Sequence, residues 1–490
     1  MKYSYPIYIF CICFSLLCNA QNGKLNYSDD TTFPKGRIGI LTQKIINTIN
    51  SNDGRAIKEF IENSFTEDFQ NFAPMEAHQG HFLNYYRQTG GVSFYSIRTY
   101  APKNEQETTL ILLDKNYDSW QKISFSFVDG EDLLLKGIGF SSAEIPTAIL
   151  ETKISSGELI EETRKTVEKL SKLDLFSGTI LIANGNDIRY QEARGEASKR
   201  FHIKNNLETK FNLGSMNKMF TSVAVMQLAE TGQINLKDPI NTYVDETWLA
   251  PEITSKVNIH HLLSHTSGLG SYFNETFWKS SRALYRKVDD FKALVKGETL
   301  AFEPGEQYGY SNTGMLLLGV IIEKVTGQDY FEYVDENIFQ PLQMGNTNSY
   351  EMDQPVENLA IGYEPSQNSY GWENNLYKHV IKGGPAGGGF STVGDLHKFA
   401  MALLKQKLVS KESLDLLWNN SSNAGYGYGF TIGHSASGKV VGHGGGFPGL
   451  NANLDIFLDK DYIVVVMSNY DGGASPLAKK VNNLIGRLSE

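Results

Sequence analysis

A serine and a lysine stand one helical turn apart, as Ser215-Met-Asn-Lys218, at the start of a long apolar segment. The residues that follow, as far as Gly232, are apolar around most of the circumference of a helix, which is typical of a helix buried in a domain interior. Burial disfavours a charged ammonium group and lowers the pKa of its lysine. The segment therefore requires a fold that encloses a helix carrying a serine and a lysine able to act as its base.

The two side chains can cooperate because residues three apart lie on the same face of a helix. A serine hydroxyl is a poor nucleophile until a positioned base takes its proton, and a neutral Lys218 can do so for Ser215. The unpaired amides of the first helical turn, together with the positive end of the helix dipole, would stabilise an oxyanion near Ser215. The sequence therefore predicts acyl transfer on Ser215.

Short motifs alone do not identify this site, because they recur by chance. Ser-x-x-Lys also occurs as Ser119-Trp-Gln-Lys122, where alternating apolar and polar residues predict a strand that directs the two side chains to opposite faces. Tyr-x-Asn occurs both as Tyr272-Phe-Asn274 and as Tyr310-Ser-Asn312. Order and context must decide between the copies.

Six motifs give the candidate site its context. They are Phe211-Asn-Leu-Gly-Ser215-Met-Asn-Lys218, His261-Leu-Leu-Ser-His265-Thr-Ser-Gly-Leu269, Phe302-Glu-Pro-Gly305, Tyr308-Gly-Tyr310-Ser-Asn312, Pro385-Ala-Gly-Gly-Gly-Phe390-Ser391 and Gly442-His443-Gly-Gly-Gly446. In this order, over about residues 155–490, the chain resembles the serine beta-lactamase-like superfamily, in its class C beta-lactamase, esterase and D-aminopeptidase branch.

This resemblance implies a role for each residue of the site. Ser215 would accept the acyl group, Lys218 would be its base or proton relay, and Tyr310 would be the second catalytic acid/base. Asn312 would hold the substrate amide and Lys218. The fold implied for this domain is mixed α/β, with a central antiparallel sheet flanked by helices and a helical region.

The third motif, His443-Gly444-Gly445, departs from the family pattern. By resemblance it lies on a strand at the edge of the central sheet, and the amide of Gly446 completes an oxyanion hole with that of Ser215. Beta-lactamases and many transpeptidases of the family carry Lys-Thr/Ser-Gly here, which holds a substrate carboxylate. A histidine is only partly protonated at neutral pH, so this anion clamp is weakened. The departure favours esters or amides without that carboxylate, although His-x-Gly versions also occur in peptidase members.

Three functions stay open on the sequence. We favour a serine hydrolase that cleaves a small ester or amide through an acyl-enzyme on Ser215, with D-amino-acid peptides among its candidate substrates. The first alternative is a beta-lactamase or D,D-peptidase that requires a substrate carboxylate. The second is a non-catalytic recognition protein that kept the fold, which the intact Ser215, Lys218 and Tyr310 disfavour. The sequence does not name the acyl group.

Other chemistries are less well supported. His261 and His265 have the spacing of two metal ligands on a helix, but no glutamate follows the metalloprotease pattern, so we expect no metal and no cofactor. The glycine-rich segment 383–389 lacks the Gly-Lys-Ser/Thr of a phosphate-binding loop and is predicted to form a tight wall. Tyr426-Gly-Tyr428 is compatible with either a substrate cleft or strand packing.

Residues 1–20 have the features of an export signal. Lys2 precedes an apolar run, and Cys18-Asn-Ala20 provides small residues for cleavage. The alternative is a lipid anchor at Cys18, which the large Leu17 disfavours. We expect a periplasmic or secreted enzyme after cleavage near Ala20. All three cysteines lie within this signal, so the mature chain has no disulfide or thiol chemistry.

Charge and hydropathy narrow the range of partners. The chain carries a formal net charge of -10 and shows no basic stripe with interleaved aromatic residues, so nucleic acid is not an expected partner. No later apolar run is long enough to span a bilayer. We expect a small-molecule or short-peptide substrate, and the sequence does not indicate an oligomeric state.

At 490 residues the chain is predicted to form two units after the signal. Residues 21–150 show helical patterns near 38–49 and 57–61, then strand-like runs at 92–100, 108–113, 123–128 and 133–138. In element order this small α+β unit resembles the cone-shaped nuclear-transport-factor-2-like fold, and an accessory role is expected. Pro146 and the polar segment 153–157 predict a linker to the catalytic unit, residues 155–490.

Two hairpins bracket the predicted catalytic unit. The first turns at Asn184-Gly-Asn186, and the second turns around Asp459-Lys-Asp461 before a helix that starts near Pro476. These strands suit one antiparallel sheet beside a helical region that carries Ser215. The cleft is expected at the junction between them.

Overall fold

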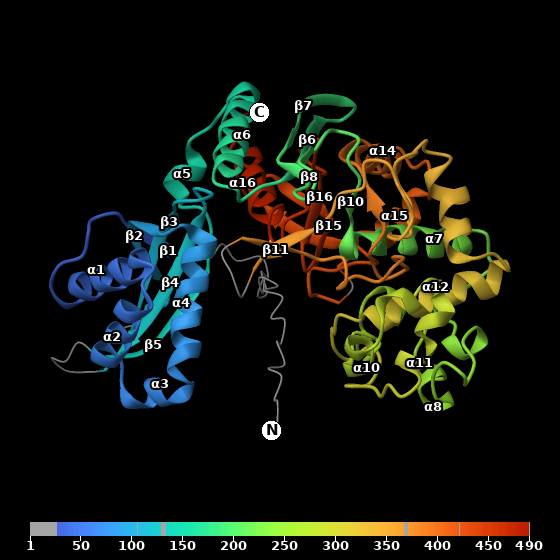
Figure 1. Cartoon of the computed structure of the whole chain (residues 1–490), viewed down its shortest axis with the longest axis horizontal. Helices are drawn as coiled ribbons and strands as arrows, with labels where there is room; N and C mark the ends of the chain where they lie inside the picture. The colour runs from blue at the N-terminus through green and yellow to red at the C-terminus, as the bar shows by residue number, and fades with distance from the viewer. Residues whose placement is uncertain (1–26, 105, 129–133, 367–370, 421, 490) are drawn as a thin grey trace. The chain divides into compact units, whose positions relative to one another are not determined.

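The computed structural model describes residues 27–104, 106–128, 134–366, 371–420 and 422–489. The predicted export signal, its cleavage site near Ala20 and the alternative anchor at Cys18 lie outside these residues. The chain divides into two compact units, residues 1–149 and 150–490 (Figure 1). None of the described helices combines the length and apolarity needed to cross a membrane.

The N-terminal unit is a layer of helices on a five-stranded antiparallel sheet. Its helices are α1 (Gly36–Ser51), α2 (Gly54–Ser64), α3 (Glu67–Phe72) and α4 (Met75–Thr89). Its strands, in spatial order, are β1 (Tyr27–Asp30), β2 (Val92–Tyr100), β3 (Glu107–Asp114), β4 (Trp120–Phe127) and β5 (Leu135–Ser142). The helices and strands share one apolar core, in which Ile45, Ile61 and Leu110 are fully buried.

The predicted strand patterns correspond to β2–β5, whereas β1, α3 and α4 were not anticipated. The short strand β1 extends the sheet by pairing with β2, and Asp29 and Arg98 on these strands form an ion pair with 2.8 Å between Oδ2 and Nη2. Helix α4 has a weakly periodic sequence, because His78 and Tyr85 take core positions beside Phe82. The resemblance of this unit to the nuclear-transport-factor-2-like fold stays a prediction.

The C-terminal unit is built on a six-stranded antiparallel sheet of order β14-β15-β16-β17-β6-β7, which confirms the predicted mixed α/β fold. The strands are β14 (Thr431–Ser435), β15 (Gly438–Phe447), β16 (Leu450–Phe457), β17 (Tyr462–Ser468), β6 (Gly178–Asn184) and β7 (Asp187–Arg194). Both predicted hairpins are present, and they join where β17 pairs with β6, Val465 opposite Leu181. The two ends of the catalytic unit therefore meet in the middle of one sheet.

Helices cover both faces of this sheet. Helices α6 (Ser156–Lys172) and α16 (Ser475–Ile485) pack together, α16 on β16 and β17 and α6 on β7. Helix α14 (Val393–Leu404) packs on the β6 and β17 residues of the opposite face. Because successive strand residues alternate between faces, Leu181 and Ala183 join the core around the serine-bearing helix, while Ile180 and Ile182 are buried on the other side.

The rest of the unit forms short strands and the helical region. The remaining strands are β8 (Glu196–Ser198), β9 (Ile203–Lys204), β10 (Phe211–Asn212), β11 (Tyr363–Pro365), β12 (Trp372–Asn374) and β13 (Phe390–Ser391). The remaining helices are α5 (Thr147–Glu151), α7 (Asn217–Glu230), α8 (Pro251–Thr254), α9 (Ile259–Leu263), α10 (Glu275–Lys279), α11 (Lys292–Val295), α12 (Asn312–Thr326), α13 (Tyr330–Val334) and α15 (Lys411–Leu417). Single turns η1–η5 lie at Gly214–Met216, Ile240–Thr242, Arg282–Leu284, Val288–Phe291 and Asp335–Phe339.

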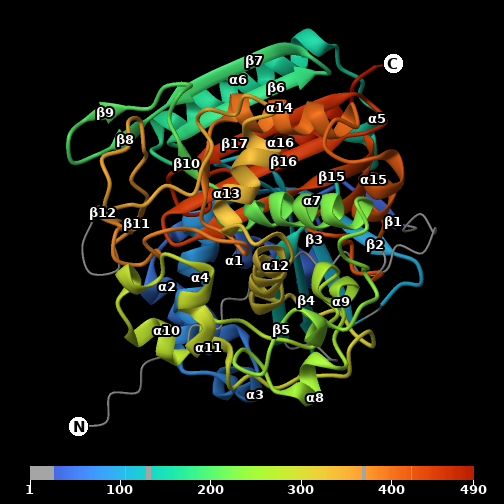
Figure 2. The same ribbon diagram turned by 90° about the vertical axis from the view of Figure 1, so that its right-hand side faces the viewer.

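Helix α7 lies between the sheet and the helical region, as its uniform apolarity predicts. In Figure 2 it lies in front of β15 and β16, with α12 beside it. Phe220 on α7 makes edge-to-face contacts with Phe339 and Phe399, with ring centroids 5.0 and 4.7 Å apart. These contacts hold the helix in place, and with it the turn that precedes it.

The predicted linker, residues 153–157, is more ordered than its composition suggests. The Ile154 amide donates to Arg487 O at 3.0 Å and the Ser489 amide donates to Ile154 O at 3.0 Å, so this segment pairs with the end of the chain. Ser155 then caps α6 in a reciprocal capping box with Glu158. The polar Ser-Ser-Gly segment begins helix α6 here, although its composition is also typical of a linker.

We expect Phe220→Ala to lower the free energy of unfolding by about 3–5 kcal/mol, because it opens a cavity in the core around α7. Phe201→Ala is the control: Phe201 is 66% exposed, and its loss should change stability by less than about 0.5 kcal/mol. Denaturant unfolding followed by circular dichroism measures both. A loss below about 1 kcal/mol for Phe220→Ala would show that α7 is not packed as described.

Candidate active site

The candidate nucleophile lies on a single turn, η1, directly before α7. Gly214 adopts φ +50°, and an added Cβ there would lie 2.9 Å from the amide nitrogen of Gly446. The Gly388 amide donates to Gly214 O at 3.0 Å, which anchors the turn to the glycine-rich segment. Ser215 is partly exposed, whereas Gly214 and Met216 are buried, so Ser215 is the accessible residue of the turn.

Lys218 is completely buried and its amine is surrounded by oxygen atoms. Nζ lies 3.2 Å from Ser215 Oγ and 2.9 Å from Asn312 Oδ1, and it also donates to the carbonyl of Ala386. The oxygens of Asn312 and Ala386 can only accept hydrogen bonds. A neutral amine satisfies both with its two N–H groups, and its lone pair is then left for the hydroxyl proton of Ser215.

The protonation state of Lys218 follows from its burial. Desolvation holds the pKa of this amine well below its usual value, and the described residues include no carboxylate hydrogen-bonded to it. The neutral form is the one able to accept a proton. The site therefore holds a lysine prepared to act as a base.

Tyr310 completes the hydroxyl network. Its hydroxyl is hydrogen-bonded to the Ser215 side chain, and its ring centroid lies 4.8 Å from Lys218 Nζ. Burial raises the pKa of the phenol, and the bond to Ser215 opposes this rise only in part. Tyr310 is therefore a proton donor at neutral pH, and the protons can be arranged from Tyr310 to Ser215 to Lys218.

Asn312 is the first residue of α12, where the helix cap fixes it. Ser311 accepts from the Gly314 amide at 2.8 Å and donates to Gly270 O at 2.9 Å. The side-chain nitrogen of Asn312, Nδ2, donates to Ser271 Oγ at 3.1 Å, and the side-chain oxygen, Oδ1, is thereby directed to Lys218. The structure thus brings together Ser215, Lys218, Tyr310 and Asn312, whereas Tyr272 of the second Tyr-x-Asn copy is a buried core residue.

Strand β15 runs past the serine turn with alternate residues facing it. A Cβ added to Gly445 would lie 1.9 Å from Leu213 O, so this strand approaches the turn as closely as a backbone can. The prediction that this motif lies on the edge strand was wrong, because β14 lies outside β15. However, β14 pairs with β15 only up to Gly442, and the stretch from His443 onward has one edge clear of β14.

His443 is buried and both of its ring nitrogens are occupied. Nδ1 lies 2.6 Å from Gly444 O, a pure acceptor, so Nδ1 carries the proton and Nε2 accepts from Tyr426 OH at 3.0 Å. Burial lowers the pKa of His443 to about 3, and a proton on Lys218 would oppose its protonation further. The sequence predicted partial protonation, whereas the structure favours the neutral ring throughout the physiological range. His443 thus supplies no cation to hold an anion.

The histidines of the alternative metal hypothesis have structural partners. His261 Nδ1 accepts from the Asn258 amide at 3.3 Å, and His265 Nδ1 accepts from the Ser311 amide at 3.2 Å. His265 also lies against the rings of Tyr310 and Tyr426, with centroids 4.5 and 4.6 Å away. In the part of the chain that the structure describes, no cluster of three or more metal-ligating side chains is found.

The glycine-rich segment 383–389 forms the predicted wall, but its carbonyl groups do more than the sequence indicated. Pro385 O accepts from Thr221 Oγ1 at 2.8 Å and Gly384 O accepts from Asn217 Nδ2 at 3.2 Å. With Ala386 O on Lys218, three successive carbonyls bind the first turns of α7. A backbone carbonyl has no sequence signature, so this contribution could not have been predicted.

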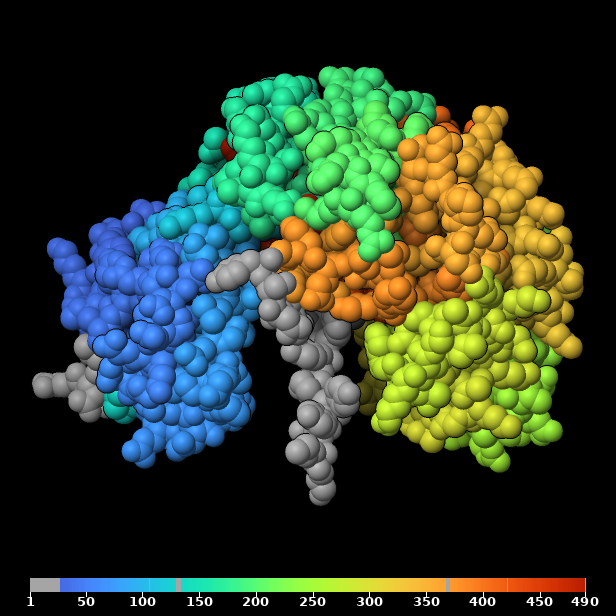
Figure 3. Space-filling model, in the orientation of Figure 1, coloured from blue at the N-terminus to red at the C-terminus, as the bar shows by residue number. Residues whose placement is uncertain are grey.

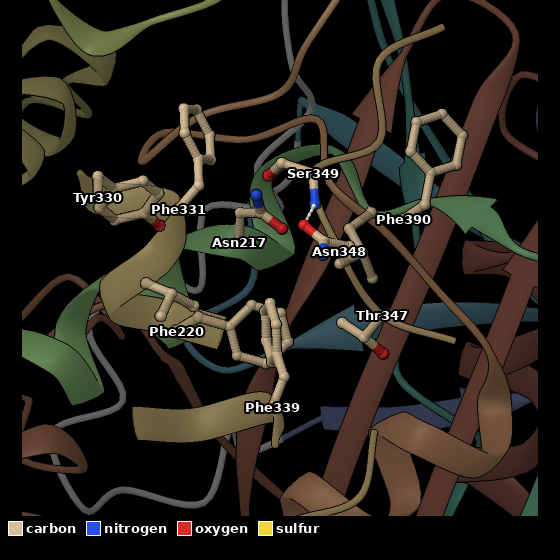
Figure 4. A pocket seen from close by; sticks show the side chains of 11 residues that line it. Asn217, Phe220, Tyr330, Phe331, Phe339, Thr347, Asn348, Ser349 and Phe390 are labelled. Carbon is tan, nitrogen blue, oxygen red and sulfur yellow. Dashed lines mark hydrogen bonds between the residues drawn. The ribbon is translucent and has the colours of Figure 1, made fainter. Parts of the chain in front are cut away.

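A pocket lies beside the start of α7 (Figure 4). Its lining residues are Leu213, Asn217, Phe220, Tyr330, Phe331, Val334, Phe339, Thr347, Asn348, Ser349 and Phe390. Neither Ser215 nor Lys218 lines it. It is therefore a gap beside the catalytic helix and is not the place where a reacting bond would lie.

Known proteins are similar to this chain over its C-terminal unit. The family model described as Beta-lactamase matches residues 163–485. Penicillin-binding protein 4* of Bacillus subtilis (strain 168) is 31% identical over 324 residues, which cover 62% of this chain and 70% of that protein. A penicillin binding protein from Bacillus halodurans has TM-score 0.59 and 29% identity, covering 67% and 98% of the two chains. A D-stereospecific amidohydrolase from Streptomyces sp. has TM-score 0.55 and 25% identity, covering 66% and 97%.

We expect Gly445→Ala to slow covalent labelling of Ser215 by a fluorophosphonate about 100-fold, because the new methyl group would separate β15 from the serine turn. Gly444→Ala is a matched control. Its Cβ would point away from the turn and meet Asn453 Oδ1 at 3.6 Å, an ordinary contact. Mass spectrometry of the labelled protein gives both rates. Equal rates for the two variants would contradict the close approach of β15 to Ser215.

The rate of the same labelling should fall as pH is lowered through the pKa of Lys218, because the protonated amine no longer accepts the serine proton. Below that pKa we expect about a tenfold loss per pH unit. In His443→Gln the acid limb should stay at the same pH, since the pKa of His443 is about 3 and its ring is already neutral there. A limb that disappears in this variant would assign it to His443.

Proposed function

The chain belongs to the beta-lactamase family, and we propose that it is an exported serine hydrolase that cleaves a small ester or amide through an acyl-enzyme on Ser215. The observation that carries the proposal is the position of Lys218 Nζ, 3.2 Å from Ser215 Oγ, with acceptor oxygens on its other sides. This arrangement leaves the amine lone pair to the serine proton. A serine without a base would have no such use for a buried, uncompensated lysine.

In the proposed acylation, Ser215 Oγ attacks the substrate carbonyl carbon and its proton passes to Lys218 Nζ. The carbonyl oxygen becomes an oxyanion, which the amides of Ser215 and Gly446 stabilise. Support for this pairing comes from Gly214, where an added Cβ would lie 2.9 Å from the Gly446 amide nitrogen, so this amide lies beside the serine turn. Fixed donors need no reorganisation when the charge develops.

Collapse of the tetrahedral intermediate breaks the bond to the leaving group. Tyr310 gives the leaving atom its proton, in keeping with its high phenol pKa, and takes up the proton that Lys218, whose Nζ lies 4.8 Å from its ring centroid, received from Ser215. A water molecule then attacks the acyl-enzyme, with the same pair taking its proton and returning one to Ser215 Oγ. Water adds across the scissile bond, and the site returns to its starting protonation.

The neutral His443 bears on the choice between substrates. A penicillin or a terminal D-alanine presents a carboxylate, and the family pattern that holds it uses a cation and a hydroxyl. This chain has a buried neutral imidazole and two glycines in those positions. We therefore favour esters or amides without that carboxylate. The likeness to a D-stereospecific amidohydrolase adds D-amino-acid amides and peptides to the candidates.

A beta-lactamase or D,D-peptidase is the second candidate, and the similarity to penicillin-binding proteins is the observation that favours it. It predicts that a substrate carboxylate raises kcat/KM. A non-catalytic recognition protein is the third candidate, which predicts that labelled Ser215 stays acylated. The N-terminal unit is proposed as an accessory to the hydrolase, whose substrate is a small molecule or a short peptide.

The test is the initial rate of aryl-ester hydrolysis by residues 21–490, with Ser215→Ala assayed beside it. We expect steady turnover by the wild type and a loss of about a thousandfold or more in the variant, because the nucleophile is removed. Lys218→Arg should lose a similar factor, since a guanidinium stays protonated.

Equal rates for the wild type and Ser215→Ala would overturn the proposal. A single burst of product without turnover would favour the recognition protein. Comparison of D-phenylalanine amide with D-alanyl-D-alanine peptides then separates the first two candidates, because only the second requires a free carboxylate.

A further inference from the structure

We propose that the acyl part of the substrate carries an aromatic or branched apolar group, which packs on the rings of Phe273, Trp278 and Phe447. We call these three residues the aromatic shelf. The inference rests on the proposed function and deepens it, because it assigns a chemical class to the acyl group of the same reaction.

The shelf is a continuous aromatic surface. The rings of Trp278 and Phe447 are nearly parallel, at 10° with centroids 6.2 Å apart, and Phe273 lies 5.5 Å from Phe447. Trp278 is 48% exposed, and Phe273 and Phe447 are partly exposed. Large apolar side chains left open to water beside a reactive site are suited to bind an apolar ligand group.

Two short connections along the chain link the shelf to the site. Phe447 directly follows Gly446 on β15, at the part of the strand that β14 leaves clear. Phe273 and Trp278 lie on the segment that starts at Ser271, whose hydroxyl accepts from the Asn312 side chain. The shelf therefore joins the oxyanion side of the site to the residue that holds Lys218.

The direction of β15 assigns the shelf to the acyl side. His443 lies near Lys218 and accepts a hydrogen bond from Tyr426. The Tyr426 ring in turn lies against that of Tyr310. The His443 end of the strand is therefore the side from which protons are donated. The leaving group must depart toward those donors. Phe447 faces the same way as His443 but lies beyond Gly445, past the serine turn, where the acyl group remains.

The polar groups around the shelf are already engaged, so the shelf offers ring carbons. Trp278 Nε1 donates to Phe273 O at 3.1 Å. His379, whose ring centroid is 4.7 Å from that of Phe447, has Nε2 bonded to Pro448 O at 3.2 Å and a pKa lowered by burial to about 4. Arg282 directs its guanidinium to backbone carbonyls, including Ser280 O at 2.9 Å. Arg282 keeps its positive charge, but its guanidinium already donates to backbone carbonyls, so an anionic acyl group would have to displace those bonds to reach it.

The shelf is also held rigid before any ligand arrives. The Arg282 guanidinium lies 4.0 Å from the ring centroid of Phe277 and 5.3 Å from that of Trp278, and Arg282 O accepts from the Ile381 amide at 3.2 Å. Arg286 binds Asp353 with 3.2 Å between Nη1 and Oδ1. In Figure 3 the two segments so joined, yellow-green and orange, meet on one face. A preformed surface avoids an ordering cost on binding.

The test compares p-nitrophenyl acetate with p-nitrophenyl phenylacetate, which share a leaving group and differ in the acyl group. We expect wild-type kcat/KM to favour the phenylacetyl ester at least tenfold. Trp278→Ala and Phe447→Ala should each reduce this ratio at least fivefold, and Trp278→Phe should preserve most of it. Phe201→Ala removes an aromatic ring of 66% exposure from the loop between β8 and β9, and it is the control that should leave both rates unchanged.

A second pair, benzyl acetate and ethyl acetate, varies the leaving group instead. Its ratio should not move in Trp278→Ala, and a change there would overturn the assignment to the acyl side. Ser215-dependent hydrolysis with no phenylacetyl preference, or with a preference that survives both alanine variants, would overturn the shelf and leave the proposed function standing. If neither ester is hydrolysed in a Ser215-dependent way, the proposed function fails and this inference fails with it.

Discussion

The burial of the Lys218 amine against oxygens that can only accept hydrogen bonds is the constraint on which the rest of the site depends. Asn312 contributes its oxygen because Ser271 takes its amide nitrogen, and Ala386 contributes a carbonyl because the glycine-rich segment lies flat against η1 and α7. These contacts come from three separate parts of the chain. Each of them directs the same lone pair to Ser215, so the position of the base is determined several times over.

The same region avoids fixed charge. His443 and His265 are neutral imidazoles, and Tyr426 is a buried phenol whose pKa is raised by desolvation. In such surroundings a charge that develops during reaction interacts strongly with the few oriented dipoles present. The backbone amides beside Ser215 are then the main groups available to stabilise an oxyanion, because the histidines described around them carry no charge.

Sequence reasoning went furthest where a residue type is tied to a position on a helix. Ser215, Lys218 and the apolar length of α7 were evident from spacing, and the copy at Ser119 was rejected from strand periodicity, which β4 bears out. Partners from the backbone, such as Ala386 O, were not predictable, because every residue has a carbonyl. The hydrogen bond between Tyr426 and His443 was not predicted for another reason. It depends on how strand β15 packs, which a short Tyr-Gly-Tyr pattern does not show.

Helix α7 is at once the centre of the hydrophobic core and the support of the nucleophile. Burying an amine inside such a core opposes folding, and an apolar side chain of similar length at position 218 would suit the interior better. Selection for a more stable chain and selection for a working one therefore act in opposite directions on Lys218. A lysine kept at this position is therefore explained by its use as a base for Ser215 and not by its effect on stability.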